Sequence, residues 1–564
     1  MKRGMTVDIG VQSFEKISAR ESFYVDKTDL IREWWQNGAD VTLITRPRRF
    51  GKTLNLSMLE CFFSNKYEGR ADLFEGLSIW NDEYYRQLQG TYPVIFFSFA
   101  KIKAVDYEGM KYSVTKIISD LYRQNRFLLE SGILDQNEKE YFESIRPEME
   151  SSVAVDAVNT LAGFLSRYYG RNVIILLDEY DTPMQEAWLS GYWNKAVGFF
   201  RSFFNAVFKS NPFMQRGLIT GITRISKESI FSDLNNLEVI TTTSEKYAQY
   251  FGFTEREVFA ALDDMELGEE KQGVKNWYDG FTFGSITDIY NPWSIANFIS
   301  RRGEYDTYWA DSSGNGLVNA LIKTGSANMK KNMELLMQGE SFEVEIDEQI
   351  IFDQLDNDEN AIWSLLLATG YLRVVRLKRM GRLLKKIYTL RLTNMEVESM
   401  FAKMIRGWFQ NTAEVYNEFI RALLNDNVKK MNTFMNKVAL NTFSSFDSGN
   451  KPSRETEPER FYHGFVLGMV VDLADKYKIR SNRESGYGRY DIMIEPFDKR
   501  EKAFIFEFKI LDKDDEAALE DTVANALAQI EEKQYETELI ANGIAPENIR
   551  KYGFAFEGKK CLIG

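Results

Sequence analysis

The sequence predicts an α/β protein whose first domain is built on a parallel β-sheet. Short apolar runs, each with the length of a strand buried on both faces, alternate with stretches of helical periodicity. Such runs are VTLIT at residues 41–45, PVIFFSFA at 93–100, NVIILLD at 172–178 and RGLITG at 216–221. Alternation of buried strands with helices is typical of a parallel sheet that carries helices on both faces.

A chain of 564 residues is too long for a single hydrophobic core, so about three domains are expected. The composition after about Thr243 becomes rich in turn signals, and the stretch SSFDSGNKPSRETEP at 444–458 reads as a linker. These features predict an N-terminal domain at 1–243 and a mainly helical, winged-helix-like middle region at 244–443. A C-terminal α/β domain is predicted at 444–564.

A candidate phosphate-binding loop follows the first strand. In RPRRFGKT, Gly-Lys-Thr opens a helix directly after a tight turn, which aims backbone N–H groups and the positive end of the helix dipole at one place. Lys52 would then reach the β- and γ-phosphates of ATP, and the Thr53 hydroxyl would hold Mg²⁺. The alternative is an ordinary strand-turn-helix with a basic turn.

The loop departs from the usual pattern at its first glycine, which is Arg46 here, so that only Gly51 remains. A left-handed residue other than glycine costs about 1–2 kcal/mol. Either the loop follows another path, or contacts hold Arg46 in place. Arg46 and Gly51 are included with Lys52 and Thr53 as candidate nucleotide-binding residues.

Acidic residues at the end of the 172–178 strand supply the second half of this site. Asp178 is placed to bind the Mg²⁺ shell, and Glu179 to polarise an attacking water. Farther along, Thr223 or Arg224 follows the 216–221 strand, where a polar side chain can sense a γ-phosphate. A helix cap with a surface arginine is the alternative for that pair.

Two further segments could contact ligands. Tyr24, Asp26 and Lys27 precede the loop and are weaker candidates to lie near the nucleotide base. Residues Leu372–Leu392 predict a β-hairpin that turns near Met380-Gly381 and carries eight basic residues and no acid. Contact with DNA phosphates is one interpretation. A solvated hairpin, or one that docks on acidic parts of the chain, is the other. After it, Thr393 and Glu396 predict a capping box.

A second constellation lies near the C-terminus, where the runs GRYDIMIEP and AFIFEFKI predict neighbouring strands. Glu507 and Lys509 are two residues apart and therefore share one face of an otherwise apolar strand. Asp491 and Glu507 could bind Mg²⁺ or Mn²⁺, and Lys509 could position the attacking water at a phosphodiester. A sheet with a structural Glu-Lys pair is the alternative.

An additional carboxylate near this metal is expected from the preceding segment. Glu459, which is four residues before His463, is the leading candidate, and Glu484 competes with it. Gln529, Lys533 and Tyr535 follow in a helical stretch and could contact DNA or support the site.

The composition excludes several other classes. A single histidine rules out a multi-histidine metal site, and two cysteines 500 residues apart suggest neither a disulfide framework nor a zinc cluster. The net charge of −13 argues against a generally basic nucleic-acid coat. No apolar run approaches 18 residues, and the first residues lack a signal-peptide core, so the expectation is a cytoplasmic protein without membrane contact.

The chain resembles bacterial proteins that join an AAA-ATPase-like N-terminal domain to a C-terminal PD-(D/E)XK nuclease-superfamily domain. The resemblance rests on blocks in family order: FYVDKTDLI, RPRRFGKTLNLSML, LLDEYDTPM, LITGITRIS, NWYDGFTFG with YNPWS, and SNRESGYGRYDIMI with FIFEFKI. It implies a P-loop ATPase sheet, a restriction-endonuclease-like C-terminal domain, and Arg46 as the family's own loop residue. By position it implies two residue sets: Lys52, Thr53, Asp178 and Glu179 for nucleotide, and Asp491, Glu507 and Lys509 for nuclease chemistry.

The sequence therefore predicts an ATP-binding, ATP-hydrolysing protein in which the P-loop domain gates a metal-dependent DNA endonuclease, with RNA as an open alternative. The competing hypothesis is a nucleotide-dependent switch that binds nucleic acid or a protein partner without cleaving it. ATPases of this type often assemble, so a homo-oligomer is also considered.

Overall fold

The computed structural model describes most of the chain, which forms two compact units. The first unit comprises residues 1–321 and 341–398, and the second comprises 322–340 and 399–564. The predicted boundaries at 243 and 443 remain predictions, because one compact unit can contain several domains. The described residues are 7–20, 22–209, 211–224, 230–231, 234–310, 316–324, 326–337, 339–346, 355, 358–382, 384–407, 413–442, 473, 476–485, 488–512, 516–557 and 560–564.

A five-stranded parallel sheet forms the centre of the N-terminal part, as the sequence predicts. The order of its strands is β2-β3-β4-β1-β5, with every neighbouring pair parallel. Because β4 lies between β1 and β3, the carboxyl ends of these three strands meet at one edge of the sheet. The strands are β1 (Val41–Thr45), β2 (Val94–Ser98), β3 (Val173–Asp178), β4 (Met214–Gly221) and β5 (Leu237–Ile240).

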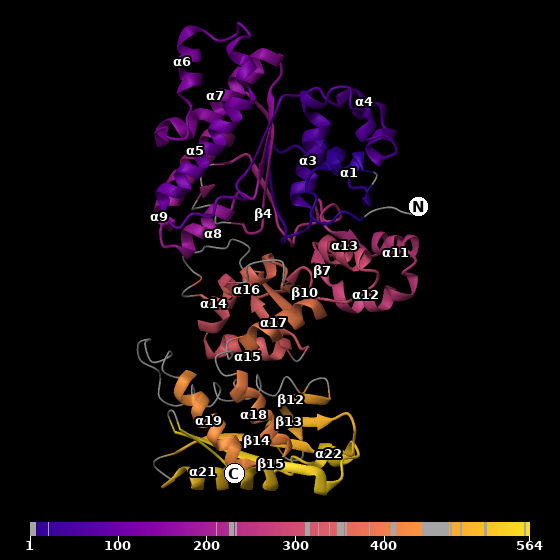
Figure 1. Cartoon of the computed structure of the whole chain (residues 1–564), viewed down its shortest axis with the longest axis vertical. Helices are drawn as coiled ribbons and strands as arrows, with labels where there is room; N and C mark the ends of the chain where they lie inside the picture. Colours follow the sequence, from indigo (N-terminus) through magenta and orange to yellow (C-terminus); the bar gives the residue numbers. More distant parts are fainter. Residues whose placement is uncertain are drawn as a thin grey trace. The chain divides into compact units, whose positions relative to one another are not determined.

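Helices cover both faces of this sheet (Figure 1). On one side lie α5 (Tyr107–Gln124), α6 (Gln136–Ser144), α7 (Ser151–Tyr169), α8 (Thr182–Leu189) and α9 (Trp193–Phe208). On the other side lie α1 (Phe14–Ala19), α3 (Lys52–Phe63) and α4 (Glu83–Leu88). A phenylalanine stripe fixes α9, since Phe200 and Phe203 pack against Phe99 at ring distances of 5.7 and 6.1 Å. Helix α2 (Asp29–Gln36) precedes β1.

The chain after β5 folds into a small antiparallel sheet with strand order β6-β8-β7 and three helices. A capping box begins α11, in which Thr254 and Glu257 bond reciprocally to each other's backbone N–H groups. Asn291 caps α13, and Pro292 is that helix's first residue. The elements are β6 (Phe253–Thr254), α11 (Glu255–Asp264), α12 (Lys271–Tyr278), β7 (Phe281–Phe283), β8 (Ile286–Tyr290) and α13 (Pro292–Ser300).

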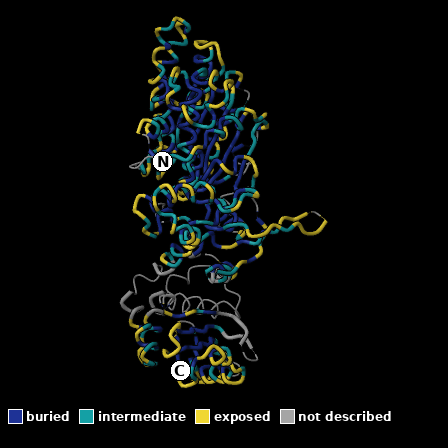
Figure 2. The backbone as a smooth tube through the Cα atoms, turned by 90° about the vertical axis from the view of Figure 1, so that its right-hand side faces the viewer, coloured by how far each residue is buried: buried dark blue, intermediate teal, exposed yellow. Residues whose placement is uncertain are grey.

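The predicted basic hairpin is confirmed as β10 (Leu372–Met380) and β11 (Lys385–Leu392). A third strand, β9 (Phe342–Glu345), pairs with β11. Beyond the helix α16 (Glu359–Ala368), the hairpin extends as a projection whose described residues near the turn are exposed (Figure 2). Helices α14 (Gly316–Thr324) and α15 (Ala327–Met337) precede β9 in the chain.

The capping box predicted after the hairpin is wrong. The hydroxyl of Thr393 donates to the carbonyl of Gly370, and Asn394 instead accepts the backbone N–H of Val397 at the start of α17 (Met395–Gly407). The carboxylate of Glu396 points into the protein, where it accepts a hydrogen bond from Ser294 and another from the backbone of Trp309. Tertiary partners therefore replaced the local ones.

The second unit is an α/β fold around a mixed sheet of order β12-β13-β14-β15-β16, in which only β14 and β15 are parallel. Buried residues on one face of the sheet pack against α18 and α19, and those on the other face pack against α21 and α22. The elements are α18 (Ala413–Leu424), α19 (Val428–Thr442), β12 (Tyr477–Ser485), β13 (Gly488–Pro496), β14 (Ala503–Ile510), α21 (Leu519–Glu532), α22 (Thr537–Ala541), β15 (Ile549–Glu557) and β16 (Lys560–Ile563).

An α/β fold is therefore confirmed for the parallel sheet at the N-terminus and the mixed sheet at the C-terminus. Several predictions lie outside the described residues: the linker at 444–458, Glu459 and His463. In the part of the chain that the structure describes, no helix has both the length and the apolar character needed to cross a bilayer.

Candidate functional site

The Gly-Lys-Thr loop connects β1 to α3, as the sequence predicts. Its left-handed residues are Arg49, at φ 65°, and Gly51, at φ 79°. Gly51 is the residue before the first turn of α3, so the N–H groups of that turn point toward the loop. The loop therefore follows another path than one that needs a glycine at position 46.

The guanidinium of Arg46 faces the protein interior. It donates to the carbonyls of Thr45 and Thr241 at 2.9 and 2.7 Å, and lies 4.5 Å over the Phe283 ring. Complete burial lowers the pKa of Arg46 to about 9, which still leaves a cation at pH 7. The side chain thus anchors the loop to the polypeptide after β5, and only the Arg46 carbonyl faces the loop's interior.

Lys52 is buried against its own loop. Its ammonium donates to the carbonyls of Arg46 and Pro47, both at 2.9 Å, so it lies across the turn that precedes it. Burial lowers the pKa of Lys52, while the charges of Glu179, Asp178 and Asp181 act in the opposite direction. The lysine and the three carboxylates therefore form one electrostatic group.

Asp178 joins the loop to two strands. Its carboxylate accepts hydrogen bonds from the Thr53 hydroxyl at 2.7 Å and from the Thr220 hydroxyl, at the end of β4, at 2.6 Å. Asp178 is buried, and burial raises its pKa while the two hydroxyls lower it. Thr53 and Asp178, which were predicted as ligands of one Mg²⁺, are therefore brought into direct contact.

Glu179 follows in a left-handed conformation, at φ 52°. Its carboxylate is half-buried and accepts a hydrogen bond from the Thr182 hydroxyl at 3.0 Å. Strained backbone of this kind concentrates at functional sites. Glu179 also lines the cavity next to the loop, whereas Asp178 lies behind Thr53.

Asp181, which sequence reasoning missed, holds the end of β4 in place. It is fully buried and accepts from the backbone N–H and the hydroxyl of Thr223, at 2.8 and 2.7 Å. Gly221 permits this approach, since a Cβ there would lie 2.7 Å from the Asp181 carboxylate. The Thr223 hydroxyl is thus engaged inside the protein, and Arg224 follows it half-buried.

A cavity of about 700 Å³ opens beside the loop. This volume falls within the range of about 300–1,000 Å³ that ligand pockets occupy. Gly51, Lys52 and Thr53 line it, together with Glu179 and the aromatic residue Trp293. The donor set fits a nucleoside triphosphate with Mg²⁺: helix N–H groups and Lys52 for phosphate, and Thr53 with Asp178 for the ion.

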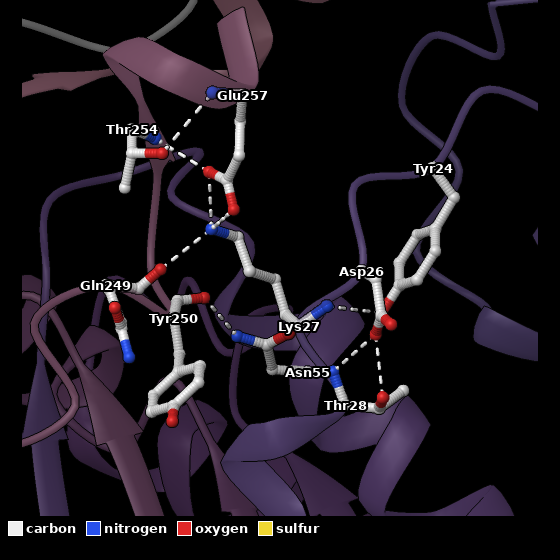
Figure 3. A network of polar contacts seen from close by, with 9 residues as sticks. All are labelled: Tyr24, Asp26, Lys27, Thr28, Asn55, Gln249, Tyr250, Thr254 and Glu257. Carbon is white, nitrogen blue, oxygen red and sulfur yellow. Dashed lines mark hydrogen bonds and ion pairs between the residues drawn. The ribbon is translucent and has the colours of Figure 1, made fainter. Parts of the chain in front are cut away.

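The segment before the loop is tied to α11 (Figure 3). The buried Lys27 ammonium donates to both oxygens of Glu257 at 2.7 Å and to the carbonyl of Gln249 at 2.7 Å. Asn55, in the first turn of α3, donates to the carbonyl of Tyr250 in the same network. Lys27 and Tyr24 also line the cavity, so their proposed place near a base stays a prediction.

The neighbouring Asp26 has a structural role. Its carboxylate accepts from the backbone N–H and hydroxyl of Thr28, at 2.9 and 2.7 Å, and from the backbone N–H of Ser78 at 2.7 Å. These bonds hold the start of α2.

Residues far along the chain also contact the loop at Arg48 and Arg49. The Arg48 carbonyl accepts from the Asn291 side chain at 3.2 Å and from the Trp309 indole at 3.0 Å. The Arg49 guanidinium lies 4.1 Å over the Trp293 ring. Sequence reasoning missed these partners: Asn291 and Trp293 belong to the block YNPWS, which was used only for the family resemblance, and Trp309 lies outside it.

In the second unit, Asp491 and Glu507 face each other on adjacent strands. The antiparallel register pairs Ile492 with Phe506, which places Asp491 opposite Glu507. The Asp491 carboxylate accepts the backbone N–H of Phe508 at 2.7 Å, and Glu507 is 4% exposed. Two carboxylates on one face of neighbouring strands fit a hard divalent cation.

Gln529 on α21 connects Glu507 with Lys509. Its amide oxygen accepts from the Lys509 ammonium at 2.8 Å, while its amide nitrogen donates to Glu507 and, at 3.1 Å, to the Tyr535 hydroxyl. Burial raises the pKa of Tyr535, as do the charges of Glu507 and Asp491. The predicted face is therefore covered by a helix, and both carboxylates lie near one tyrosine.

The third carboxylate of this site is not located. Glu459 lies outside the described residues, and for Glu484 only the backbone, in β12, is described. Both stay predictions. Lys533 caps the end of α21 and is likewise left as a predicted DNA contact.

An unexpected acidic group lies in the first unit. The carboxylates of Glu255, Asp279 and Asp288 lie within 4.8 Å of one another, and Lys275 pairs with Glu255 and with Asp288. Burial and the neighbouring Asp288 raise the pKa of Asp279 to about 7. Lys275 already compensates part of this negative charge.

The basic residues of the hairpin fall into two groups, those in ion pairs with β9 and those exposed near the turn. Lys378 and Lys385 pair with Glu343 and Glu345 of β9, so their charges are partly neutralised. Arg379 and Arg382 are exposed near the turn. Docking on acidic parts of the chain, the alternative reading, therefore holds for the two lysines.

A parallel sheet with Gly-Lys-Thr after β1 and an acidic pair after β3 defines the class of P-loop nucleotide-binding folds. Family models agree with this class. Residues 8–231 match a family described as "Predicted AAA-ATPase", and residues 457–564 match the PD-(D/E)XK nuclease superfamily. The resemblance seen in the sequence is confirmed, since the N-terminal part of the chain matches the AAA-ATPase-like family and the C-terminal part matches the PD-(D/E)XK nuclease superfamily.

The chain is also similar to a relative over nearly the full length of both proteins. An "Uncharacterized protein in vnfD 5'region" of Azotobacter chroococcum mcd 1 is 24% identical over 576 aligned positions. The match covers 99% of this chain and 97% of the relative.

Proposed function

We propose that this chain binds and hydrolyses ATP with Mg²⁺ and that nucleotide state gates a metal-dependent DNA endonuclease in its C-terminal domain. One observation supports the proposal: one chain contains two separate clusters of polar side chains that suit phosphate chemistry. The first joins Thr53 to Asp178, and the second joins Glu507 to Lys509 through Gln529.

In the ATPase half, each residue has a distinct task. The first-turn N–H groups after Gly51 and the Lys52 ammonium bind phosphate oxygens, once Lys52 leaves the carbonyls of Arg46 and Pro47. Thr53 and Asp178 hold the ion, which neutralises charge on the phosphates. Glu179 orients the attacking water and accepts its proton, while Thr182 holds that carboxylate in place.

In the nuclease half, Asp491 and Glu507 hold Mg²⁺ or Mn²⁺, which supplies charge stabilisation at the scissile phosphate. Lys509 positions the attacking water and stabilises negative charge on the phosphodiester oxygens. Gln529 orients Lys509 and Glu507 from the side of α21. Glu459 or Glu484 would supply a further carboxylate.

DNA contact is proposed for the hairpin and the C-terminal domain. Charge complementarity supports it, because Arg379 and Arg382 are exposed near a turn in a chain that is acidic overall. Leu384, also near this turn, is 62% exposed, and an apolar tip beside basic residues suits contact with nucleic acid.

The test is cleavage of plasmid and linear DNA by the purified full chain with Mg²⁺ or Mn²⁺, with and without ATP. We expect wild-type cleavage that Lys509→Ala abolishes and that ATP changes. Lys560→Ala, which removes an exposed lysine from β16 of the same sheet, is the matched control. Equal cleavage by wild type and Lys509→Ala would remove the nuclease assignment.

Phosphate release provides the parallel test of the ATPase half. We expect release by wild type that Glu179→Gln reduces strongly without loss of nucleotide binding. A chain that binds ATP through Lys52 but cleaves no DNA under any nucleotide condition would instead be a nucleotide-dependent switch for a nucleic-acid or protein partner.

A further inference from the structure

Arg49 is an unusual residue for the middle of a phosphate-binding loop. It adopts φ 65°, a conformation that favours glycine, and its guanidinium lies 4.1 Å over the Trp293 ring. Arg49 and Trp293 both line the cavity that Gly51, Lys52 and Thr53 also line. A strained cationic residue in the lining of this cavity calls for a physical reason.

The surrounding structure holds the strained backbone in place. The carbonyl of the preceding residue, Arg48, accepts hydrogen bonds from Asn291 and from the Trp309 indole. On the following side, the Phe50 ring is fully buried against Phe281 at 4.7 Å. Both neighbours of Arg49 are therefore fixed, while its own side chain is directed to the cavity wall.

Among the residues that the structure describes, the charge of Arg49 has no carboxylate paired with it. Throughout the described ranges, no carboxylate forms an ion pair with Arg48 or Arg49, although many other arginines have such partners, among them Arg70, with Glu15 and Asp72. An arginine that forms no such ion pair, although Glu179 and Glu186 line the same cavity, suits an anionic ligand beside a phosphate-binding loop.

The contact with Trp293 leaves the guanidinium ready to bind. Attraction between a cation and the face of an indole ring holds the guanidinium without using its N–H groups as donors to an acceptor. The five N–H groups lie in the guanidinium plane and suit phosphate oxygens. Trp293 itself is fixed, because Asn291 caps its helix and the Trp293 indole donates to the carbonyl of Tyr308 at 3.1 Å.

We propose that Arg49 binds the terminal phosphate of a nucleoside triphosphate, acting within the same chain, and that Trp293 positions it. The inference rests on the proposed ATP binding and deepens it. Lys52 and the helix N–H groups serve any nucleotide with a β-phosphate, so an added cation discriminates the triphosphate from the diphosphate. An arginine supplied by the loop itself also means that hydrolysis needs no arginine from a second copy of the chain.

The experiment measures ATP and ADP affinity of the full chain by calorimetry with Mg²⁺. Arg49→Ala is expected to weaken ATP binding about 10- to 100-fold and ADP binding less than about 3-fold. Arg86→Ala, which removes an exposed arginine paired with Glu83 on α4, is expected to change neither. Retained ADP binding shows that the variant is folded.

The role of Trp293 is tested by the ratio of ATP affinity to ADP affinity in Trp293 variants. Trp293→Leu is expected to weaken ATP binding about 3- to 10-fold with ADP binding unchanged, and Trp293→Phe to retain most ATP affinity because a ring remains. Equal loss for ATP and ADP, or equal effects of leucine and phenylalanine, would overturn the positioning role. A merely structural tryptophan would weaken both nucleotides together.

The outcomes separate this inference from the proposed function. If wild type binds both nucleotides and Arg49→Ala leaves the ratio of ATP to ADP affinity unchanged, the role of Arg49 is overturned and the ATPase proposal stands. If wild type binds neither nucleotide, both fail. Hydrolysis that rises steeply with protein concentration at saturating ATP would contradict action within one chain.

Discussion

The Thr53 hydroxyl donates a hydrogen bond to the Asp178 carboxylate at 2.7 Å, although the two residues are 125 positions apart in the sequence. The Asp178 carboxylate accepts a second hydrogen bond from the Thr220 hydroxyl. Strands β3 and β4 and the first turn of α3, which follows β1, thus contribute one polar cluster at the carboxyl ends of the parallel strands, which is where open α/β sheets bind ligands.

Thr53→Val should reduce Mg²⁺-dependent ATP hydrolysis about 10- to 100-fold, because removal of the hydroxyl takes away one proposed ligand of the ion and leaves the Asp178 carboxylate with the Thr220 hydroxyl as its remaining side-chain donor among the described contacts. Thr53→Ser keeps the hydroxyl and should remain close to wild type. Phosphate release measured across a Mg²⁺ titration checks this, and removal of the ion with EDTA should abolish activity. Equal rates for valine and serine would contradict the role.

Gln529→Ala should lower metal-dependent DNA cleavage about 10- to 100-fold, since Gln529 orients both Lys509 and Glu507. Asn525→Ala on the same helix is the control, because Asn525 bonds only to Glu516 among the described partners and lies on the exposed side. Initial cleavage rates compare the two variants. Unchanged cleavage in Gln529→Ala would show that α21 does not support the site.

Phe50→Ala should lower the free energy of unfolding of the first unit by about 3–5 kcal/mol, because a fully buried ring is replaced by a cavity. The ring packs edge-on against Phe281 at 4.7 Å and Phe283 at 5.4 Å. Phe50→Leu should cost less. Urea unfolding followed by tryptophan fluorescence measures the difference, and a loss below about 1 kcal/mol would contradict tight packing there.

Glu396→Gln should flatten the dependence of stability on pH. Burial raises the pKa of Glu396 to about 7, so between about pH 4.5 and 7 the folded chain keeps a proton that the unfolded chain releases. The free energy of unfolding of wild type should therefore fall as pH rises through this window, by about 2–4 kcal/mol. Unfolding midpoints at pH 5 and 7.5 measure the slope.

Wild type must be compared with Glu396→Gln, because a second group has the same effect. The pKa of Asp279 is also raised to about 7, so Asp279 likewise makes the free energy of unfolding fall as pH rises. Glutamine can still accept from the backbone N–H of Trp309, as Glu396 does at 2.5 Å. A variant that loses stability equally at both pH values would show that the hydrogen bonds, rather than the proton, dominate.

Arg379→Ala combined with Arg382→Ala should weaken DNA binding and reduce the slope of log affinity against log salt by about 2, because each phosphate contact contributes about 1. Lys378→Ala should have a smaller effect, since Lys378 is paired with Glu343. Fluorescence anisotropy at several salt concentrations separates these outcomes. An unchanged slope would place the DNA contact elsewhere.

Local patterns in the sequence were enough to predict the main strands, the loop after β1 and the shared face of Glu507 and Lys509. Uninterrupted apolar runs indicated buried parallel strands, Gly-Lys-Thr marked the loop, and the period of two placed Glu507 and Lys509 on one face. These features depend on neighbouring residues in the chain, so periodicity suffices to read them.

Tertiary structure alone decided which partner each polar side chain found. Arg46 became a buried anchor bonded to the carbonyl of Thr241. Glu396 does not form the predicted capping box and instead accepts hydrogen bonds from the Ser294 hydroxyl and the Trp309 backbone N–H. Arg49 came to lie against Trp293. The reason is that a buried polar group must find a compensating partner wherever packing brings one, and these partners lie about 90 to 250 residues away, beyond the reach of any local pattern.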